Sequence, residues 1–298
     1  MRKMLFAGAA LACLTGPAAA QLDPAKPDDA LKMNTKVICS IKAGEHNVWY
    51  WEGTVYSRIR GEKDRHLFDV AAMSVRQCQP FNDPIRGFGT RSVNREIMLY
   101  LDPKTKQVLR SWKNPWSGEE VEVMHVHNDP VNSREPTFAR DAEGKPTAKF
   151  SHVTKDGYVY QGGGAALLFY DNPLAGEYQD YVGNKYQASE FLTATVPLEE
   201  LTDPKSSRSK NTVISWGRIS RWMPWMKMGA RDGLLVHYTG GTRLNSFEDL
   251  PAWMKKEIRA NYPTYVAPPP ANDKRPNETS WTVFKRKVDE QRAKDGKK

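Results

Sequence analysis

Two histidines separated by one residue are the strongest indication of chemistry in this sequence. His125 and His127 follow a segment at 114–118 whose proline and glycine are typical of a tight turn. Side chains of an extended strand alternate between its two faces, so both imidazoles should share the face of Val121 and Val123. The pattern therefore predicts a strand with two histidines on its apolar, inward face.

Two imidazoles on one face are compatible with three roles. As metal ligands they would need a third ligand, such as Asp129. As proton-transfer groups they would act in a metal-free pocket, and as core residues they would only make hydrogen bonds. No cysteine-rich or His-Glu-x-x-His pattern favours metal ligation, so we expect neither a metal nor another cofactor.

Glu96 is a further candidate for proton transfer. It lies in an apolar, strand-like run on the same predicted face as Asn94, Met98 and Tyr100. An inward carboxylate without a partner would suit a general base, whereas an ion pair with Arg95 on the outer surface is the alternative. The candidate catalytic residues are therefore His125, His127 and Glu96.

Tryptophan and methionine are concentrated at 218–233, in the run RISRWMPWMKMGARDG. Their side chains adapt to irregular apolar ligands, and Arg221 is suited to an anionic group at the rim of a cavity. We expect this segment either to cover a cavity as a lid or to plug one end of a barrel. The candidate ligand contacts are Trp112, Trp116, Tyr100, Trp222, Trp225 and Arg221.

Short β-like runs separated by turns make up most of the chain and must position these residues. The runs cover 48–58, 68–79, 91–101, 107–113, 119–127, 148–153, 158–170, 189–196, 212–219 and 234–244. No alternation of strands with helices appears, so neighbouring strands should pair antiparallel. We predict a mainly β protein built as an antiparallel barrel of about ten strands.

Helices are expected only near the C-terminus. Apolar residues recur at helical spacing between Leu250 and Ile258, and a second, basic helix should follow the prolines at 268–270. The predicted divisions are a signal peptide at 1–20, a single β-barrel domain at 21–265, and a Pro-rich linker with a basic C-terminal helix at 266–298.

The first twenty residues have the pattern of a secretory signal peptide. Basic residues precede a short apolar run, and small residues lead up to Ala20. The run is shorter than the roughly 20 apolar residues that span a bilayer. We therefore expect cleavage after Ala20 and a periplasmic or secreted protein.

Export makes a direct prediction for the mature chain, which should begin at Gln21. Intact-mass measurement of protein recovered from the periplasm checks this start. A retained segment 1–20, or a lipid attached to Cys13, would contradict it.

The charge of the chain is unevenly distributed. Lys and Arg number 44 against 35 Asp and Glu, and the formal net charge is +9. Many of the basic residues lie after residue 270, where they form either a solvated surface or a contact for anionic surfaces. Because exported proteins rarely meet nucleic acid, we expect no nucleic-acid partner, and we expect no stable membrane insertion.

Cys39 and Cys78 are the only cysteines after position 20. They lie in strand-like runs, 36–41 and 68–79, so a cross-strand bond is feasible, and an oxidising compartment favours it. A disulfide requires Cα atoms within about 7 Å of each other. One disulfide and two separate buried thiols are both compatible with the sequence.

The order of motifs also resembles a bacterial family known as domain of unknown function 1838. Four runs carry the resemblance: VWYWEGTVYS (48–57), SVNREIMLYLDPKTKQVL (92–109), SWKNPWSGEEVEVMHVHNDPVN (111–132), and SRWMPWMKMGARDG with ANYPTY (220–233 and 260–265). They span most of the mature chain. The resemblance implies a lipocalin-like fold. It implies no activity, because the family has none assigned and therefore offers no catalytic residues to carry over.

These features favour an exported β-barrel that binds a small apolar or aromatic compound in its interior. A cofactor-independent lyase or isomerase is the first alternative, in which an inward histidine or glutamate moves a proton on such a compound. A structural envelope protein whose basic tail contacts anionic polymers is the second alternative. The sequence is compatible with all three.

Overall fold

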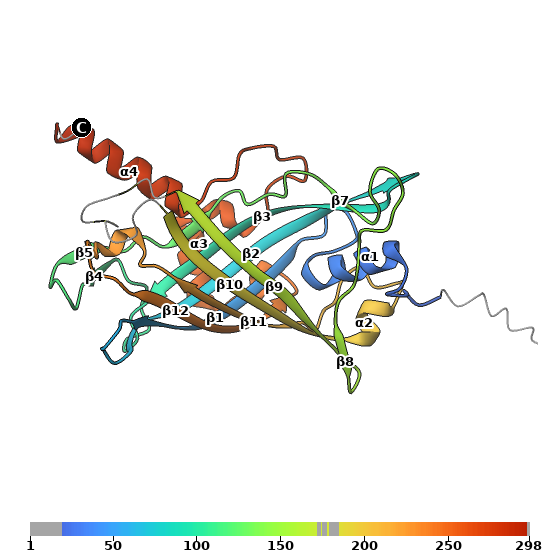
Figure 1. The fold of residues 1–298 in the computed structure, drawn as a ribbon, viewed down its shortest axis with the longest axis horizontal. Helices are drawn as coiled ribbons and strands as arrows, with labels where there is room; N and C mark the ends of the chain where they lie inside the picture. Colours follow the sequence, from blue (N-terminus) through green and yellow to red (C-terminus); the bar gives the residue numbers. More distant parts are fainter. Residues whose placement is uncertain (1–19, 172–173, 175–177, 179–184, 297–298) are drawn as a thin grey trace, which may run out of the picture.

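The computed structural model describes residues 20–171, 174, 178 and 185–296. The predicted signal peptide, apart from Ala20, lies outside the described residues. One large antiparallel sheet dominates the fold, and short helices lie against it (Figure 1). The mainly β, antiparallel prediction is therefore confirmed.

The sheet is an open path of strands in the order β6-β3-β2-β1-β12-β11-β10-β9-β8, and β7 pairs with β3. Its long strands are β1 (Asn47–Arg58), β2 (Arg65–Asp83), β3 (Gly87–Leu101), β9 (Tyr158–Asp171), β10 (Lys185–Pro197), β11 (Val213–Ser220) and β12 (Leu234–Leu244). The short strands are β6 (Val126–Asn128), β7 (Thr137–Phe138) and β8 (Val153–Lys155). In the described residues no ladder joins β8 or β9 to β3, β6 or β7. Closure into a lipocalin-like barrel stays a prediction.

The sheet curls so that β9 and β10 cross in front of β1, β2 and β3 (Figure 1). Two glycines allow the close approach of β1 and β12. A Cβ atom at Gly53 would lie 1.9 Å from the carbonyl oxygen of Tyr238, and one at Gly241 would lie 2.2 Å from that of Tyr50. Only glycine fits either position, and its use in both strands lets the sheet bend around a concave face.

The convex face of β1, β2 and β3 is covered by α3 (Ala252–Asn261) and by two 3-10 turns, η3 (Phe247–Asp249) and η4 (Pro263–Val266). Ser246 caps η3 through its side chain, and Met254 and Ile258 of α3 are fully buried against the sheet. The helix predicted between Leu250 and Ile258 is therefore confirmed.

One end of the concave face is closed by α1 (Pro27–Ile38), which the sequence analysis missed. Two acidic residues in its first turn, Asp28 and Asp29, favour a helix start next to the helix dipole. Ala30, Met33 and Val37 pack into a core with the sheet and with α2 (Leu198–Thr202). The strand expected at 36–41 is wrong, because α1 continues to Ile38.

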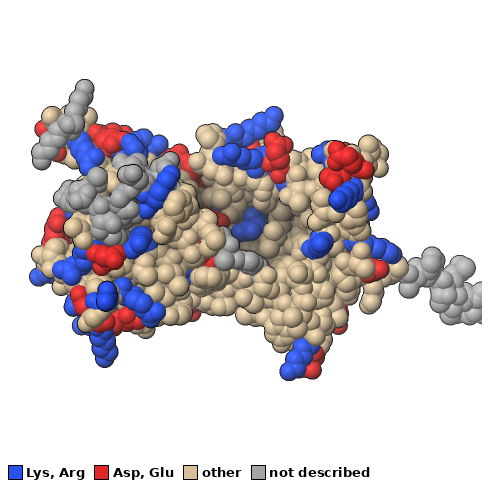
Figure 2. Space-filling model, in the orientation of Figure 1, with Lys and Arg blue, Asp and Glu red and all other residues tan. Residues whose placement is uncertain are grey.

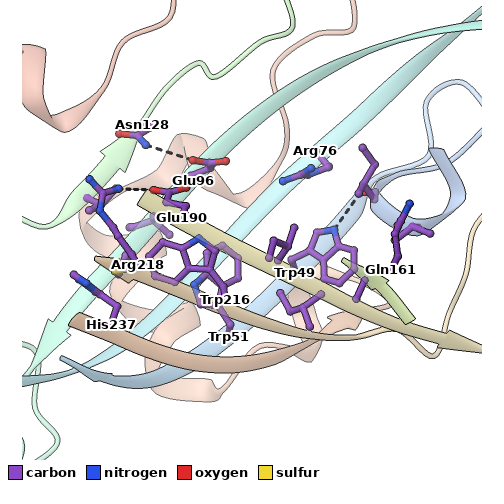
Figure 3. A pocket seen from close by; sticks show the side chains of 18 of the residues that line it. Trp49, Trp51, Arg76, Glu96, Asn128, Gln161, Glu190, Trp216, Arg218 and His237 are labelled. Carbon is purple, nitrogen blue, oxygen red and sulfur yellow. Dashed lines mark hydrogen bonds and ion pairs between the residues drawn. The ribbon is translucent and has the colours of Figure 1, made fainter. Parts of the chain in front are cut away.

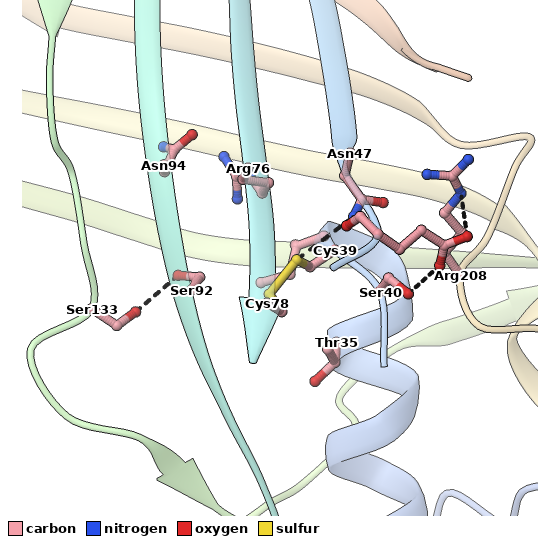
Figure 4. The surroundings of a disulfide bond; sticks show 12 residues. Thr35, Cys39, Ser40, Asn47, Arg76, Cys78, Ser92, Asn94, Ser133 and Arg208 are labelled. Carbon is pink, nitrogen blue, oxygen red and sulfur yellow. Dashed lines mark hydrogen bonds and ion pairs between the residues drawn. A yellow bond between two sulfur atoms is a disulfide. The ribbon is translucent and has the colours of Figure 1, made fainter. Parts of the chain in front are cut away.

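A disulfide fixes the end of α1 to the sheet (Figure 4). Cys39 directly follows α1 and is bonded to Cys78 of β2, with a Cα–Cα distance of 6.1 Å. Of the two states that the sequence left open, the structure has the single disulfide. Arg243 anchors the same helix end, because its buried guanidinium donates to the carbonyl oxygens of Lys36 and Val37 at 3.1 and 2.6 Å.

Three other predicted strands differ from the structure. The run at 119–127 is broken into β5 (Glu120–Glu122) and β6, because β5 pairs with β4 (Ser111–Lys113) in a separate two-stranded sheet. The run at 107–113 is a strand only in β4. The run at 148–153 is extended only from Val153, where β8 begins. All three runs are bordered by turns that interrupt the ladder.

The basic C-terminal helix is confirmed as α4 (Ser280–Lys294), which extends from one end of the molecule (Figure 1). Three of its cations form ion pairs with carboxylates: Lys285 with Asp289, Arg286 with Glu278, and Lys287 with Glu122. No described helix has the length and apolar character needed to cross a membrane.

Candidate ligand-binding site

A cavity of about 740 Å³ opens on the concave face of the sheet. Figure 2 shows this hollow, with Lys or Arg atoms at its floor. Strands from both halves of the sheet line it, together with the C-terminal half of α1. Its apolar walls include Met98, Leu192, Ala194, Ile214 and Met223.

Three tryptophans line the cavity, and strand alternation explains why. Trp49 and Trp51 are two residues apart on β1, and Trp216 comes from β11, so all three side chains point to the concave face (Figure 3). The ring centroids of Trp51 and Trp216 are 6.4 Å apart at an interplanar angle of 53°. Trp49 is held in place by donation of its Nε1–H to the carbonyl oxygen of Ile38 at 3.2 Å.

A row of polar side chains crosses three adjacent strands at one end of the cavity. Glu190 of β10 is directly paired with Arg218 of β11, which is directly paired with His237 of β12. Direct partners point to the same face of a sheet, so all three face the cavity (Figure 3). Nη1 of Arg218 lies 2.5 Å from Oε1 of Glu190.

Burial sets the protonation states in this row. Burial opposes the charge on Arg218, but Tyr186 and Glu190 outweigh it and raise the pKa of Arg218 above its ordinary value. Burial, together with the nearby charge of Arg218, lowers the pKa of His237 to about 3. His237 is therefore neutral at pH 7, and neither of its ring nitrogens has a hydrogen-bond partner among the described residues.

Tyr100 of β3 also lines the cavity. Its side chain is fully buried, and burial raises the pKa of the Tyr100 hydroxyl, which therefore keeps its proton. Phe68 and Trp225 contact its ring, with centroid distances of 5.3 and 5.5 Å. The Tyr100 hydroxyl has no hydrogen-bond partner among the described residues.

A second polar group, which is paired internally, lines the cavity from β2, β3 and β6. Glu96 accepts from the side-chain amides of Asn94 at 2.6 Å and Asn128 at 3.4 Å. Arg76 donates to Ser74 at 2.9 Å, and burial lowers the pKa of Arg76 while Glu96 opposes the shift. In the described lining, the charges of Arg76 and Arg218 therefore balance those of Glu96 and Glu190.

Of the residues predicted to carry chemistry, the structure places Glu96 in the cavity lining but neither histidine. Val126 and Asn128, which alternate with the histidines, line it instead. His125 is buried, accepts the backbone N–H of Tyr100 on Nδ1 at 3.0 Å, and has a pKa lowered to about 4 by burial. His127 contacts Tyr262, with ring centroids 6.0 Å apart. Neither histidine lines this cavity, because β6 turns Val126 and Asn128 toward it. His125 is buried like Val121 and Val123, as expected for the core role, and His127 is half-buried.

Of the predicted ligand contacts, Tyr100 lines the cavity and the others lie beside it. Trp112, Trp116, Trp222, Trp225 and Arg221 are absent from its lining. Trp222 is fully buried and packs on Trp116, while Trp225 packs on Trp112, around the 3-10 turn η2 (Pro224–Met226). The segment therefore packs as a plug behind Tyr100. Within 221–233, Met223 is the residue that lines the cavity.

Several lining residues were missed by the sequence analysis. They are Trp49, Trp51, Arg76, Glu190, Trp216, Arg218 and His237. The alternating tryptophans of VWYWEG, and single charges inside otherwise apolar strands, were signals that would have found them. No group of three or more His, Cys, Asp or Glu side chains suited to a metal ion occurs in the part of the chain that the structure describes.

Comparison with known proteins identifies a family for this chain but does not assign it an activity. No curated protein and no solved structure matches the chain. One family model, described as a protein of unknown function (DUF1838), matches residues 44–288. The matched region contains every strand of the large sheet and most of the cavity lining. The chain therefore belongs to the DUF1838 family.

Proposed function

We propose that this protein is exported and binds a small, largely apolar compound with a ring system in the cavity of its sheet. The observation that carries the proposal is a cavity of about 740 Å³ flanked by Trp49, Trp51 and Trp216. Cavities of roughly 300 to 1,000 Å³ with mostly apolar walls and a few polar groups are typical of small-molecule sites. Indole rings favour flat partners, because aromatic rings pack in offset or tilted pairs.

The curled antiparallel sheet supports this proposal, because it encloses the cavity on several sides. Its long strands supply the walls, and α1 and the plug around η2 close the ends. The hollow visible in Figure 2 is the expected route of entry into the cavity. Binding then requires no movement of the buried Trp222 and Trp225.

Catalysis is the second candidate, because the cavity also holds groups that exchange protons. Glu96, Glu190 and His237 face the space beside the tryptophans, and His237 is neutral at pH 7. A carboxylate that removes a proton and a neutral donor that returns it would suffice for an isomerase or a lyase without a cofactor. Turnover of a bound compound, lost in Glu190→Gln and Glu96→Gln, would distinguish this candidate from binding alone.

Filling the cavity provides the direct test of binding. Ala194 of β10 is buried in the lining, whereas its neighbour Thr193 is exposed on the other face of the same strand. Ala194→Phe should weaken saturable binding of an apolar fluorescent dye by about tenfold or more, which is about 1.4 kcal/mol. Thr193→Phe, the matched control, should leave the affinity unchanged.

Dye fluorescence titrated against each purified protein measures both affinities, and circular dichroism checks that each variant is folded. If Ala194→Phe does not fold, Leu192→Trp at the same wall replaces it. Unsaturable dye binding by the wild type, or equal affinity in the lining and control variants, would reject the cavity as the binding site.

A further inference from the structure

The polar end of the cavity contains hydrogen-bond donors that the protein itself does not use. Nε of Arg218, Nε1 of Trp51 and the Tyr100 hydroxyl are buried and have no hydrogen-bond partner among the described residues. All three residues line the same cavity. Buried donors are almost always paired in folded proteins, and each unpaired donor lowers stability, so a cluster of them needs a physical reason.

The register of the strands brings these donors to one end of the cavity. Trp51 lies on β1, two residues before Gly53. Gly53 is paired with Val70 of β2, and Val70 is paired with Tyr100 of β3, so Tyr100 lies two strands across the sheet from Gly53. Tyr100 and Arg218 line the same cavity, and the charge of Arg218 acts on the Tyr100 hydroxyl. Figure 3 shows Trp51, Trp216, Arg218 and His237 gathered at this end.

The unpartnered groups at this end determine which kind of ligand atom could form hydrogen bonds with them. Arginine and tryptophan nitrogens only donate hydrogen bonds, and the protonated tyrosine hydroxyl also donates. His237, which is 1% exposed and neutral, adds one N–H and one acceptor nitrogen. A ligand amine or hydroxyl hydrogen would have to share the carboxylates of Glu190 and Glu96, which already accept from Arg218 and Asn94, and would leave the unpartnered donors unsatisfied. An oxygen with two lone pairs fits the donors.

The balance of charge selects a neutral oxygen. Arg76 and Arg218 are matched by Glu96 and Glu190 in the described lining. A carboxylate ligand would add a second negative charge beside Glu190 without a cation to balance it, and burying an unbalanced charge is costly. A ketone, ester or amide oxygen accepts two or three hydrogen bonds at this end and brings no charge.

We propose that the ligand carries a neutral carbonyl group, whose oxygen accepts hydrogen bonds from Tyr100, Arg218 and Trp51 while its ring system lies between Trp51 and Trp49. This inference rests on the proposed binding function and names the chemical class of its ligand. The apolar walls would bind many ring compounds, and the donors at the polar end would select the carbonyl compound among them.

A set of ligands with the same ring separates the carbonyl inference from the binding proposal. We would titrate the purified protein with 2-acetylnaphthalene, 2-ethylnaphthalene and 2-naphthoate, and follow displacement of the fluorescent dye. Two net hydrogen bonds predict about 30-fold tighter binding of the ketone than of the hydrocarbon. The carboxylate should bind more weakly than the ketone.

Variants then assign the preference to the donors. Tyr100→Phe removes a hydroxyl that has no partner, so it should not harm folding, and it should lower ketone affinity about fivefold without changing hydrocarbon affinity. Tyr265→Phe is the matched control, because Tyr265 is buried on the convex face of the sheet. It should change neither affinity.

The outcomes distinguish the two proposals. If the ketone and hydrocarbon bind saturably with equal affinity, the cavity binds ring compounds and the carbonyl inference is overturned. Tightest binding of 2-naphthoate would overturn it in favour of an anion site. If no member of the set binds, the binding proposal fails and the inference fails with it.

Discussion

At pH 5 we expect the free energy of unfolding to be about 4 kcal/mol lower than at pH 7.5, because two buried histidines resist protonation. Burial lowers the pKa of His125 to about 4 and that of His237 to about 3. Both rings are less than 5% exposed, so solvent screens them little. The charged groups near them are Arg110 and Glu257 for His125, and Arg218 for His237.

The direction of the pH effect follows from the unfolded chain, in which a histidine titrates near pH 6.5. Above that pH both states are neutral, and the contribution of each histidine to stability is fully present. As the pH falls below about 6.5, the two histidines bind protons in the unfolded chain but remain neutral in the folded protein. The stability is therefore lost progressively until the folded pKa values near 4 and 3 are reached.

Urea unfolding followed by tryptophan fluorescence at pH 7.5 and pH 5 measures this loss. The double variant His125→Gln with His237→Leu removes both titrating rings and should flatten the dependence between these pH values. His152→Gln is the control, because His152 is only half-buried, just before β8, and should leave the loss near 4 kcal/mol. An equally steep dependence in the double variant would show that other groups are responsible.

The sequence predicted the strands well because their patterns are long. The strands β1, β2, β3 and β12 are each at least eleven residues long, so the strand-like runs could be recognised, and the even spacing of Glu96 and Tyr100 predicted their shared face. Pro27 and Asp28 mark the start of α1, but the short run at 36–41 has the pattern of a strand. Short apolar runs are ambiguous between helix and strand.

The cavity was harder to predict, because alternation identifies a face but not which side of the sheet is hollow. His125 and His127 were assigned to the inside on that basis, yet β6 turns Val126 and Asn128 toward the cavity. β5 ends at Glu122, and β6 begins only at Val126, where the chain pairs with β3 instead of β4. Alternation counted from Val121 correctly predicts the burial of Val123 and His125, but it does not show that the cavity lies on the opposite face, toward Val126 and Asn128.

Partners across strands are a second kind of information that one sequence lacks. Glu190, Arg218 and His237 lie on three strands, and their meeting depends on the register between those strands. The register between β10, β11 and β12 depends on the length and geometry of the connections between them, which alternation within one strand does not specify. A charge within each apolar strand predicted a buried partner, without identifying it.

Replacing Arg243 by methionine should lower the free energy of unfolding by about 3 to 5 kcal/mol. The guanidinium of Arg243 is buried and donates to the carbonyl oxygens of Lys36, Val37 and Ser209 at 3.1, 2.6 and 2.5 Å. Burial lowers the pKa of Arg243 to about 9, so the group stays charged at neutral pH. Methionine fills much of the same volume and leaves these acceptors without this donor.

The same substitution should reach the cavity, because two of the three carbonyls belong to the last turn of α1. That turn contributes Val37 and Ile38 to the lining, and Ile38 holds the indole of Trp49. The guanidinium of Arg243 also lies 4.6 Å from the centre of the Trp49 ring, so its loss removes a cation–π contact from the same wall. Dye binding to Arg243→Met should therefore weaken, under conditions where the variant is still folded.

Arg259→Met serves as the matched control. Arg259 lies on α3, its side chain is 53% exposed, and it pairs with Glu248 at the surface. Exposed ion pairs contribute roughly 0 to 1 kcal/mol, so this variant should unfold almost as the wild type does and bind the dye with the same affinity. Equal stability of the two variants would mean that α1 is held by the disulfide and by Met33 and Val37 alone. The cavity wall would then not depend on the buried arginine.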